Sequence, residues 1–443
     1  MACRFPTVAR GAPPPAQRQR GAATLINAVI ILMLMTLIAF FANRGVIFER
    51  KTAANQYRST KALEAAEAGV EWALANLNTA SRITTACAAT TASGARAFRD
   101  VYLDPDADGS YRTVSNAIPV YSPDPTPNPF STAMPVCTFS GGAWSCSCPT
   151  AGTGAAATCS DPNGCPTFRV GFTSVSNDAT IARLTVTGCT NGQFPCVGAA
   201  GDARADGTAR ITQVVKVLSG LASTPAAAIT AKGNVNFGSN AISATNTDPA
   251  TNGITINSGG NITGFINDTT INTLPGTPPG ASLVGNDNTL ATLSDDQMFK
   301  TFMGVSKDEF RNASTTTEIS CNGVCNSTLS DAISNGARTL WVEGDMTLNA
   351  NNVYGSPTTP IILVVNGNIA LRGTMIIYGV VYCQNTTWDN TGGGDATVYG
   401  AVIAEGSFTA TGTPNPTYDP NVLRRLRETT GSFAKVPGGW RDF

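Results

Sequence analysis

Histidine is absent from this 443-residue sequence, and only 13% of its residues are charged, with a formal net charge of −1. The lack of histidine removes the commonest general base and metal ligand. The low charge removes the usual signature of a nucleic-acid-binding protein, which needs a concentrated basic surface. A G-x-S-x-G elbow, a Cys/His pair and a phosphate-binding loop are also missing, so an enzyme is the least favoured class of protein.

Charge is missing altogether from one stretch near the N-terminus. From Ala22 to Ala42 no residue is charged, and the only polar ones are two threonines and one asparagine. A helix of this length, at about 1.5 Å of rise per residue, reaches about 30 Å and can cross a bilayer core. Residues 1–21 before it are basic and rich in proline, which predicts a disordered arm on the cytoplasmic side.

The apolar stretch continues directly into an amphipathic pattern. Residues 62–75 are rich in strong helix formers, and the glutamates among them lie on different helix faces from the apolar residues. Apolar residues follow steps of three and four: Leu63, Ala66, Val70, Ala73 and Leu77. This spacing predicts one helix over residues 22–80, half of it in lipid and half packed on a globular head.

Residues 81–222 predict that head. Strand-like runs rich in β-branched residues occur at Phe168–Val175, Thr180–Thr187 and Thr208–Leu218, separated by turn residues. We expect an antiparallel sheet that packs on the helix and is held by disulfide bonds.

Twelve cysteines supply the candidates for those bonds, and eight of them lie between Cys87 and Cys196. Zinc is the alternative, but the spacing gives no paired C-x-x-C knuckles and an exported chain meets an oxidising compartment. Small loops could be closed by Cys189–Cys196 and by Cys321–Cys325. Cys3 would leave with the leader, and Cys383, in an apolar strand, is predicted to be the unpaired buried thiol. The disulfide candidates are Cys87, Cys137, Cys146, Cys148, Cys159, Cys165, Cys189, Cys196, Cys321 and Cys325.

One short motif suggests calcium. Asp104, Asp106 and Asp108, followed by Gly109, fit the D-x-D-x-D-G opening of a calcium loop. The twelfth position, usually glutamate, is Ser115, so a solvated acidic turn is the alternative.

Residues 223–415 contain an internal repeat. A polar residue, glycine and a small polar residue precede an alternation of apolar and polar residues, and Ile377–Val381 is echoed by Val398–Val402. The glycine and its polar neighbours suit a sharp bend of the chain, and short strands that recur after such bends predict a β-solenoid. A β-sandwich is the alternative. A helical insertion is expected to start at Ser294. The copies begin at Lys232, Glu343, Asn366 and Glu405, with a weaker copy at Gly259.

The fold class is therefore α+β: a long N-terminal helix packed on an antiparallel sheet, followed by a mostly β domain. Residues 416–443 form a C-terminal tail, in which an arginine-bearing helix buries Val422, Leu423 and Leu426.

The N-terminal stretch resembles the leader of type IV prepilins, and in particular PilX-type minor pilins. Those proteins have a short basic arm, Arg-Gly, an apolar helix and an Ala/Glu-rich segment, matched here by Arg20-Gly21-Ala22 and by residues 62–71. The resemblance covers residues 19–78. It implies cleavage by the prepilin peptidase between Gly21 and Ala22, methylation of the new amino terminus, and packing of the helix in a filament core.

One departure from the family's pattern concerns a charge. Major pilins carry glutamate at the fifth mature position, which is Ile26 here, with Asn27 next. That glutamate is thought to compensate the amino terminus of a neighbouring subunit in an apolar core, where an unpaired charge is costly. A subunit without it, carrying a bulky repeat domain, fits the tip of a fibre better than its shaft.

The hypothesis from sequence is thus a minor pilin that helps to prime assembly at or near the pilus tip. The alternatives are an adhesin or DNA-uptake module carried on the pilus, and a minor pseudopilin of type II secretion. Expected partners are other minor and major pilins, the prepilin peptidase, the inner-membrane assembly machinery and a tip adhesin. The expected location is the inner membrane with a periplasmic head, and then the extracellular pilus. No specific nucleic-acid site is identifiable, and calcium is the only cofactor suggested.

Overall fold

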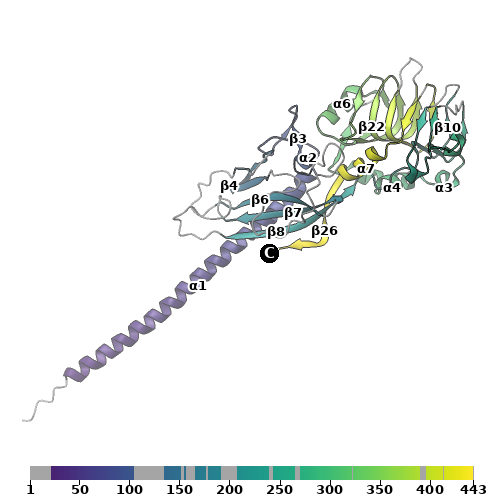
Figure 1. The fold of residues 1–443 in the computed structure, drawn as a ribbon. Coiled ribbons are helices and arrows are strands. Elements are labelled where there is room, and N and C mark those ends of the chain that lie inside the picture. The colour runs from purple at the N-terminus through teal and green to yellow at the C-terminus, as the bar shows by residue number, and fades with distance from the viewer. Residues whose placement is uncertain are drawn as a thin grey trace, which may run out of the picture. The chain divides into compact units, whose positions relative to one another are not determined.

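A computed structural model describes residues 21–103, 134–150, 154–155, 165–175, 178–190, 207–238, 243–264, 270–321, 323–389, 396–412 and 414–442. The chain forms two compact units, Met1–Arg58 and Ser59–Phe443. Helix α1 (Gly21–Leu77) starts in the first unit and ends in the second (Figure 1).

The first part of α1 is apolar on every face. All the side chains from Thr24 to Ala42 are exposed, and this helix is long and apolar enough to cross a membrane, with a mean hydropathy of 2.7. The hydroxyl of Thr36 donates to the carbonyl oxygen of Met33 at 2.9 Å, so this polar group is satisfied within the helix. A helix of this kind has all its backbone bonds internal and suits a lipid environment.

The second part of α1 packs on a six-stranded antiparallel sheet with the order β26-β8-β7-β6-β4-β5. The stripe of apolar residues expected from the sequence, Leu63 to Leu77, is the face that contacts the sheet, where it joins Phe168 and Val186 in one core. The predicted helix-on-sheet head is therefore confirmed. The strands are β4 (Val136–Ser140), β5 (Ala143–Ser147), β6 (Thr167–Val175), β7 (Asp178–Cys189), β8 (Thr208–Ser219) and β26 (Gly431–Arg441).

Glycines allow the helix to approach the sheet closely. A Cβ added to Gly188 of β7 would lie 2.1 Å from the carbonyl oxygen of Ala62 and 2.7 Å from the backbone nitrogen of Ala66. Both atoms belong to the helix backbone and cannot move aside as a side chain can. Position 188 therefore requires glycine for close packing.

A short helix, α2 (Phe98–Tyr102), covers the head core beside a small sheet of order β2-β1-β3. The rings of Phe98 and Tyr102 lie 4.6 Å apart, and the Tyr102 hydroxyl donates to the carbonyl oxygen of Pro149 at 2.9 Å. The small sheet consists of β1 (Arg82–Ile83), β2 (Ala89–Thr90) and β3 (Arg96–Ala97).

The second domain is a parallel β-solenoid, visible as the stacked strands around β10 and β22 in Figure 1. The 17 strands formed by its described residues pair in parallel register, as when Ile229 pairs with Ile256 and Thr339 with Ile362. The predicted solenoid is confirmed, and the β-sandwich alternative is wrong because a sandwich packs two antiparallel sheets face to face, whereas these strands pair in parallel. The strands are β9 (Ile229–Ala231), β10 (Val235–Asn236), β11 (Ala244–Thr245), β12 (Ile256–Ser258), β13 (Ile262–Thr263), β14 (Ile271–Asn272), β15 (Leu283–Val284), β16 (Thr316–Ile319), β17 (Gly323–Val324), β18 (Thr339–Glu343), β19 (Met346–Leu348), β20 (Val353–Tyr354), β21 (Ile361–Leu371), β22 (Ile376–Trp388), β23 (Thr397–Ala404), β24 (Phe408–Ala410) and β25 (Asn415–Thr417).

The coils are not stacked in chain order. Strand β9, the first in sequence, pairs with β12 on one side and with β23 on the other. The chain therefore starts in the middle of the stack, coils outward to β15, and resumes at β16 at the opposite end. It then coils back until β23 and β24 meet β9 and β10.

The repeated polar-Gly-polar triplets form one corner of the coil. The Asp345 carboxylate accepts the backbone N–H of Asn368 at 2.8 Å, and the amide of Asn385 donates to the Asn368 side chain at 2.9 Å. A Cβ on Gly367 would lie 2.4 Å from the backbone of Gly344 in the next coil. The triplets thus recur because stacked corners need glycine for space and short polar side chains for hydrogen bonds.

Two apolar cores hold the solenoid. One fills the inside of the coil, and the other lies between its outer face and the helices that cover it, where Phe299 packs on Trp341 and Tyr382. The predicted insertion at Ser294 is helix α4, whose capping box joins Ser294 and Gln297. The helices are η1 (Pro249–Thr251), η2 (Pro279–Ser282), α3 (Asn288–Ala291), α4 (Asp295–Met303), α5 (Lys307–Arg311), α6 (Asn326–Ser334) and α7 (Pro420–Thr429).

The C-terminal segment differs from the separate tail expected from the sequence. Helix α7 does bury Val422, Leu423 and Leu426, but β26 then pairs antiparallel with β8 as an edge strand of the head sheet. The solenoid is therefore an insertion between two adjacent strands of the head. The pairing joins segments more than 200 residues apart, so no local pattern announced it.

Candidate functional site

The first candidate site is the N-terminal segment. Gly21 and Ala22 are the first two residues of α1, and Ile26, which the resemblance aligns with the glutamate of major pilins, is 57% exposed. Charge returns only at Arg44, beyond the apolar stretch. The start of the helix thus offers an apolar surface without a carboxylate, which can pack among apolar helices but cannot pair with a neighbouring ammonium group.

The Ala/Glu-rich part of α1 has a different role. Small side chains, including Ala62 and Ala66, are fully buried against the sheet. Glu71 points away and forms an ion pair with Lys435 of β26. The alanines therefore serve close packing, and at least one glutamate binds the edge strand of the head.

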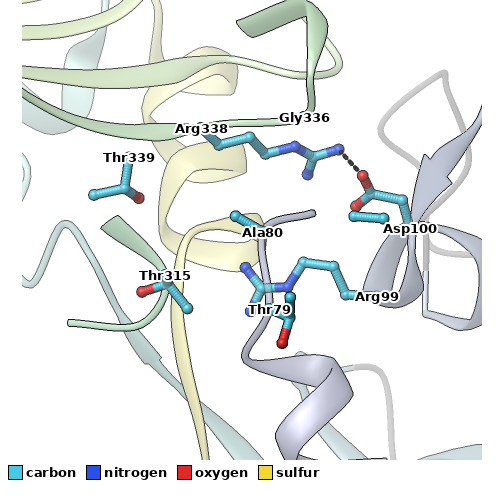
Figure 2. A pocket seen from close by; sticks show the side chains of 9 residues that line it. Thr79, Ala80, Arg99, Asp100, Thr315, Gly336, Arg338 and Thr339 are labelled. Carbon is cyan, nitrogen blue, oxygen red and sulfur yellow. Dashed lines mark ion pairs between the residues drawn. The ribbon is translucent and has the colours of Figure 1, made fainter. Parts of the chain in front are cut away.

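The second candidate site is the joint between head and solenoid, shown in Figure 2. Arg338, just before β18, points toward Asp100 of α2, and Nη2 of the arginine lies 2.9 Å from Oδ2 of the aspartate. Both side chains are mostly buried. Thr79, Ala80 and Gly336 line the same place, around a cavity of about 20 Å³. That volume holds about one water molecule and no organic ligand.

Arg99 completes this joint. Its guanidinium donates to the carbonyl oxygens of Thr429 at 3.0 Å and Gly431 at 2.8 Å, and it lies over the ring of Phe433 at 5.0 Å. Burial lowers the pKa of Arg99 to about 10, although neighbouring Asp100 opposes the shift. The group stays charged at neutral pH and links α2 to the end of α7 and the start of β26, at the point where the chain returns from the solenoid to the head.

No sequence signal identified this joint. Arg99 and Asp100 are neighbours in the sequence, but their partners, Arg338 for the aspartate and the Thr429 carbonyl for the arginine, lie more than 200 residues away. Buried arginines and aspartates require a partner, but the partner is visible only in the fold.

The cysteines lie as follows. Disulfide bonds join Cys87 to Cys148, Cys137 to Cys146 and Cys321 to Cys325, while Cys165 and Cys189 are also disulfide-bonded. Cys159 and Cys196, like the calcium candidates Asp104, Asp106 and Asp108, lie outside the described residues. Within the part of the chain that is described, no group of three or more acidic, cysteine or histidine side chains could hold a metal ion.

Cys383 is a free, buried thiol in β22, and its sulfur lies 3.0 Å from the hydroxyl oxygen of Thr386. Burial raises its pKa to about 12, so the reactive thiolate is scarce at neutral pH. We expect the peptide that contains Cys383 to remain unmodified when the native protein is treated with iodoacetamide at pH 8, and to be alkylated fully in denaturant. Peptide mass spectrometry measures both states, and rapid alkylation of the native protein would contradict the burial.

Comparisons with known proteins bear on the N-terminal site. Residues 20–71 match the protein family described as PilX N-terminal, which covers the apolar part of α1 and the Ala/Glu-rich part. Among curated proteins, none matches this sequence. Among solved structures, the chain is similar to the competence-associated pilin ComZ from Thermus thermophilus, with 11% identity over 87% of this chain and 97% of that chain and a TM-score of 0.21. A TM-score this low supports no inference about the present chain.

Proposed function

We propose that this chain is a minor pilin of a type IV pilus, located at or near the tip, because residues 20–71 match the PilX N-terminal family. The observation that carries the proposal is the family match at residues 20–71, which lies on a helix built to cross a membrane and then to pack on a head. The prepilin peptidase cuts between Gly21 and Ala22. The subunit is then held in the inner membrane with its head in the periplasm until the assembly machinery inserts it in a fibre with other pilins.

Two features favour the tip over the shaft. The chain lacks a carboxylate at position 26, so it cannot pair with the amino terminus of a neighbouring subunit in an apolar core. It also carries a solenoid inserted between β8 and β26, and such a mass on every subunit would hinder close helical packing of the shaft.

Restoring a carboxylate at that position should change where the subunit goes. We expect Ile26→Glu to raise the number of copies per fibre several-fold and to place them along the shaft, because the new charge can pair with a neighbour. The neutral variant Ile26→Gln is the matched control and should leave the location unchanged. Immunogold labelling of sheared fibres measures both. An unchanged distribution with Ile26→Glu would weaken the charge argument.

The solenoid provides a second role, the display of a binding domain at the tip. The insertion can be removed cleanly, because Gly431 pairs with Ser219 and the N–H of Gly220 donates to Thr430 at 3.3 Å. Replacing residues 221–429 by an Asn-Gly turn closes β8 and β26 as a hairpin. We expect normal fibre numbers by electron microscopy and loss of adhesion to surfaces. Loss of fibres instead would assign the solenoid to assembly, and retained adhesion would remove the display role.

The alternative of a type II secretion pseudopilin uses the same N-terminal segment. It differs in one observable, since such a subunit supports secretion of exported proteins and is absent from surface fibres.

A further inference from the structure

A polar groove opens on the outer face of the solenoid, where α4 and α5 lie beside β18 and β21. Its volume is about 350 Å³, within the range of small-ligand sites. One lining residue, Trp341, belongs to the apolar core under the covering helices, and neither the N-terminal segment nor the joint uses the groove. The lining groups that matter here are Lys300, Lys307, Asp308, Arg311, Glu343 and Asn366.

Several groups of the groove are held in fixed positions. The Glu343 carboxylate accepts from the indole N–H of Trp341 at 3.0 Å and from the amide of Asn366 at 2.8 Å, and these bonds lower its pKa. Arg311 lies between that carboxylate, at 3.4 Å, and Glu318. Glu343, Asn366 and Arg311 are thus held in place by the protein before any ligand binds.

A buried carboxylate fixes the position of Lys307. Nζ of Lys307 lies 2.7 Å from Oε1 of Glu405, a side chain only 3% exposed, and the Tyr382 hydroxyl donates to the same carboxylate at 2.8 Å. Lys307 therefore presents its remaining N–H groups in a set direction.

Other polar groups of the groove have bonding capacity to spare. Lys300, Asp296 and Asp308 are exposed, and among the residues described none has a side-chain hydrogen bond or ion pair. Lys300 can donate hydrogen bonds and the two carboxylates can accept them, so the groove can bind a molecule that both donates and accepts.

The charge and polarity of the lining residues limit the class of ligand that the groove can bind. Three basic and three acidic side chains line the groove, so its formal charge is zero and neither a strong anion nor a strong cation is favoured. Trp341 is only 2% exposed, which leaves little apolar surface for an apolar ligand.

A peptide added as a strand is also excluded. Strand β18 is paired with β16 on one side and β21 on the other, and β21 is paired with β18 and β22. No backbone edge is free at the groove, so recognition must use side chains.

We propose that this groove binds a neutral, polyhydroxylated ligand, namely a unit of a neutral oligosaccharide, through Lys300, Asp308 and Asn366. The inference rests on the proposed display role of the solenoid, to which it adds a ligand class. The test uses the isolated protein, so the inference about the ligand can fail without affecting the pilin assignment.

The full chain, purified in a polyoxyethylene detergent without a sugar headgroup, is applied to an array of immobilised neutral and acidic oligosaccharides. The affinity for the best neutral ligand is then measured for the double variant Lys300→Ala/Asp308→Ala and for Asn366→Ala. Asp331→Ala, an exposed position on α6 outside the groove, is the control. Unchanged melting temperatures establish that the variants fold. If the double variant does not fold, the single variant Asp308→Asn is tested in its place.

We expect the protein to bind neutral oligosaccharides. The affinity of the double variant should be about tenfold lower, because this variant loses two hydrogen bonds. The affinity of Asp331→Ala should stay within about twofold of that of the unaltered protein. Three results would overturn the inference: no neutral oligosaccharide bound, binding that the groove variants leave unchanged, or binding restricted to acidic oligosaccharides.

Discussion

Replacing Gly21 by leucine should leave residues 1–21 on the chain and keep the protein out of surface fibres. The proposed function puts the peptidase cut after Gly21, where a branched side chain would block it. The uncut chain keeps four arginines in the segment before α1. Charges of that kind cannot be buried among the apolar helices of a filament without a large cost in desolvation.

This prediction needs two measurements, the size of the protein in whole membranes and its amount in sheared fibres. Gly45→Leu is the matched control, because Gly45 lies on the same helix and an added Cβ there meets no atom within 4 Å. We expect full processing for Gly45→Leu and none for Gly21→Leu. Normal processing of Gly21→Leu would place the cut elsewhere and remove the basis for numbering position 26 as the fifth mature residue.

Replacing Gly188 by alanine should destabilise the head by about 3 kcal/mol, the upper part of the range for overpacked cores. The new Cβ would overlap the carbonyl oxygen of Ala62 at 2.1 Å, and relief requires moving the whole helix off the sheet. For a domain of this size, we expect the melting temperature to fall by about 10 °C.

The neighbouring strand offers a control for that substitution. Gly171 of β6 belongs to the same sheet, but the nearest atom to a Cβ added there is the carbonyl oxygen of Thr185 at 3.8 Å, an ordinary contact. Gly171→Ala should therefore change the free energy of unfolding by less than about 0.5 kcal/mol. Equal effects of the two substitutions, measured by thermal unfolding of the detergent-purified chain, would show that the helix does not pack on β7 as described.

Local patterns in the sequence were sufficient for the helix and for the repeat. The apolar stripe from Leu63 to Leu77 has helical spacing, and it is the face that packs on the sheet. The polar-Gly-polar triplets recur because each must stack on the next coil, so a physical constraint repeats along the chain and becomes visible in the sequence. Both features depend on residues close to one another or on a repeated constraint.

Non-local features could not be predicted. The pairing of β26 with β8, the placement of β9 in the middle of the solenoid, and the Asp100–Arg338 ion pair each join segments that share no local signal. The polar groove is a further case, since α4, α5, β18 and β21 contribute to it from separate parts of the chain. For the N-terminal site the situation is the reverse: Gly21, Ala22 and Ile26 lie within six residues of one another in the sequence, and the fold adds that the Ile26 side chain is exposed.

The most direct test of the pilin assignment is mass spectrometry of the N-terminal peptide of this protein, recovered from sheared surface fibres of the wild-type strain. The proposed function predicts a peptide that begins at Ala22 with a methylated amino group. A peptide that begins at Met1, together with a protein found only in the inner membrane, would contradict it.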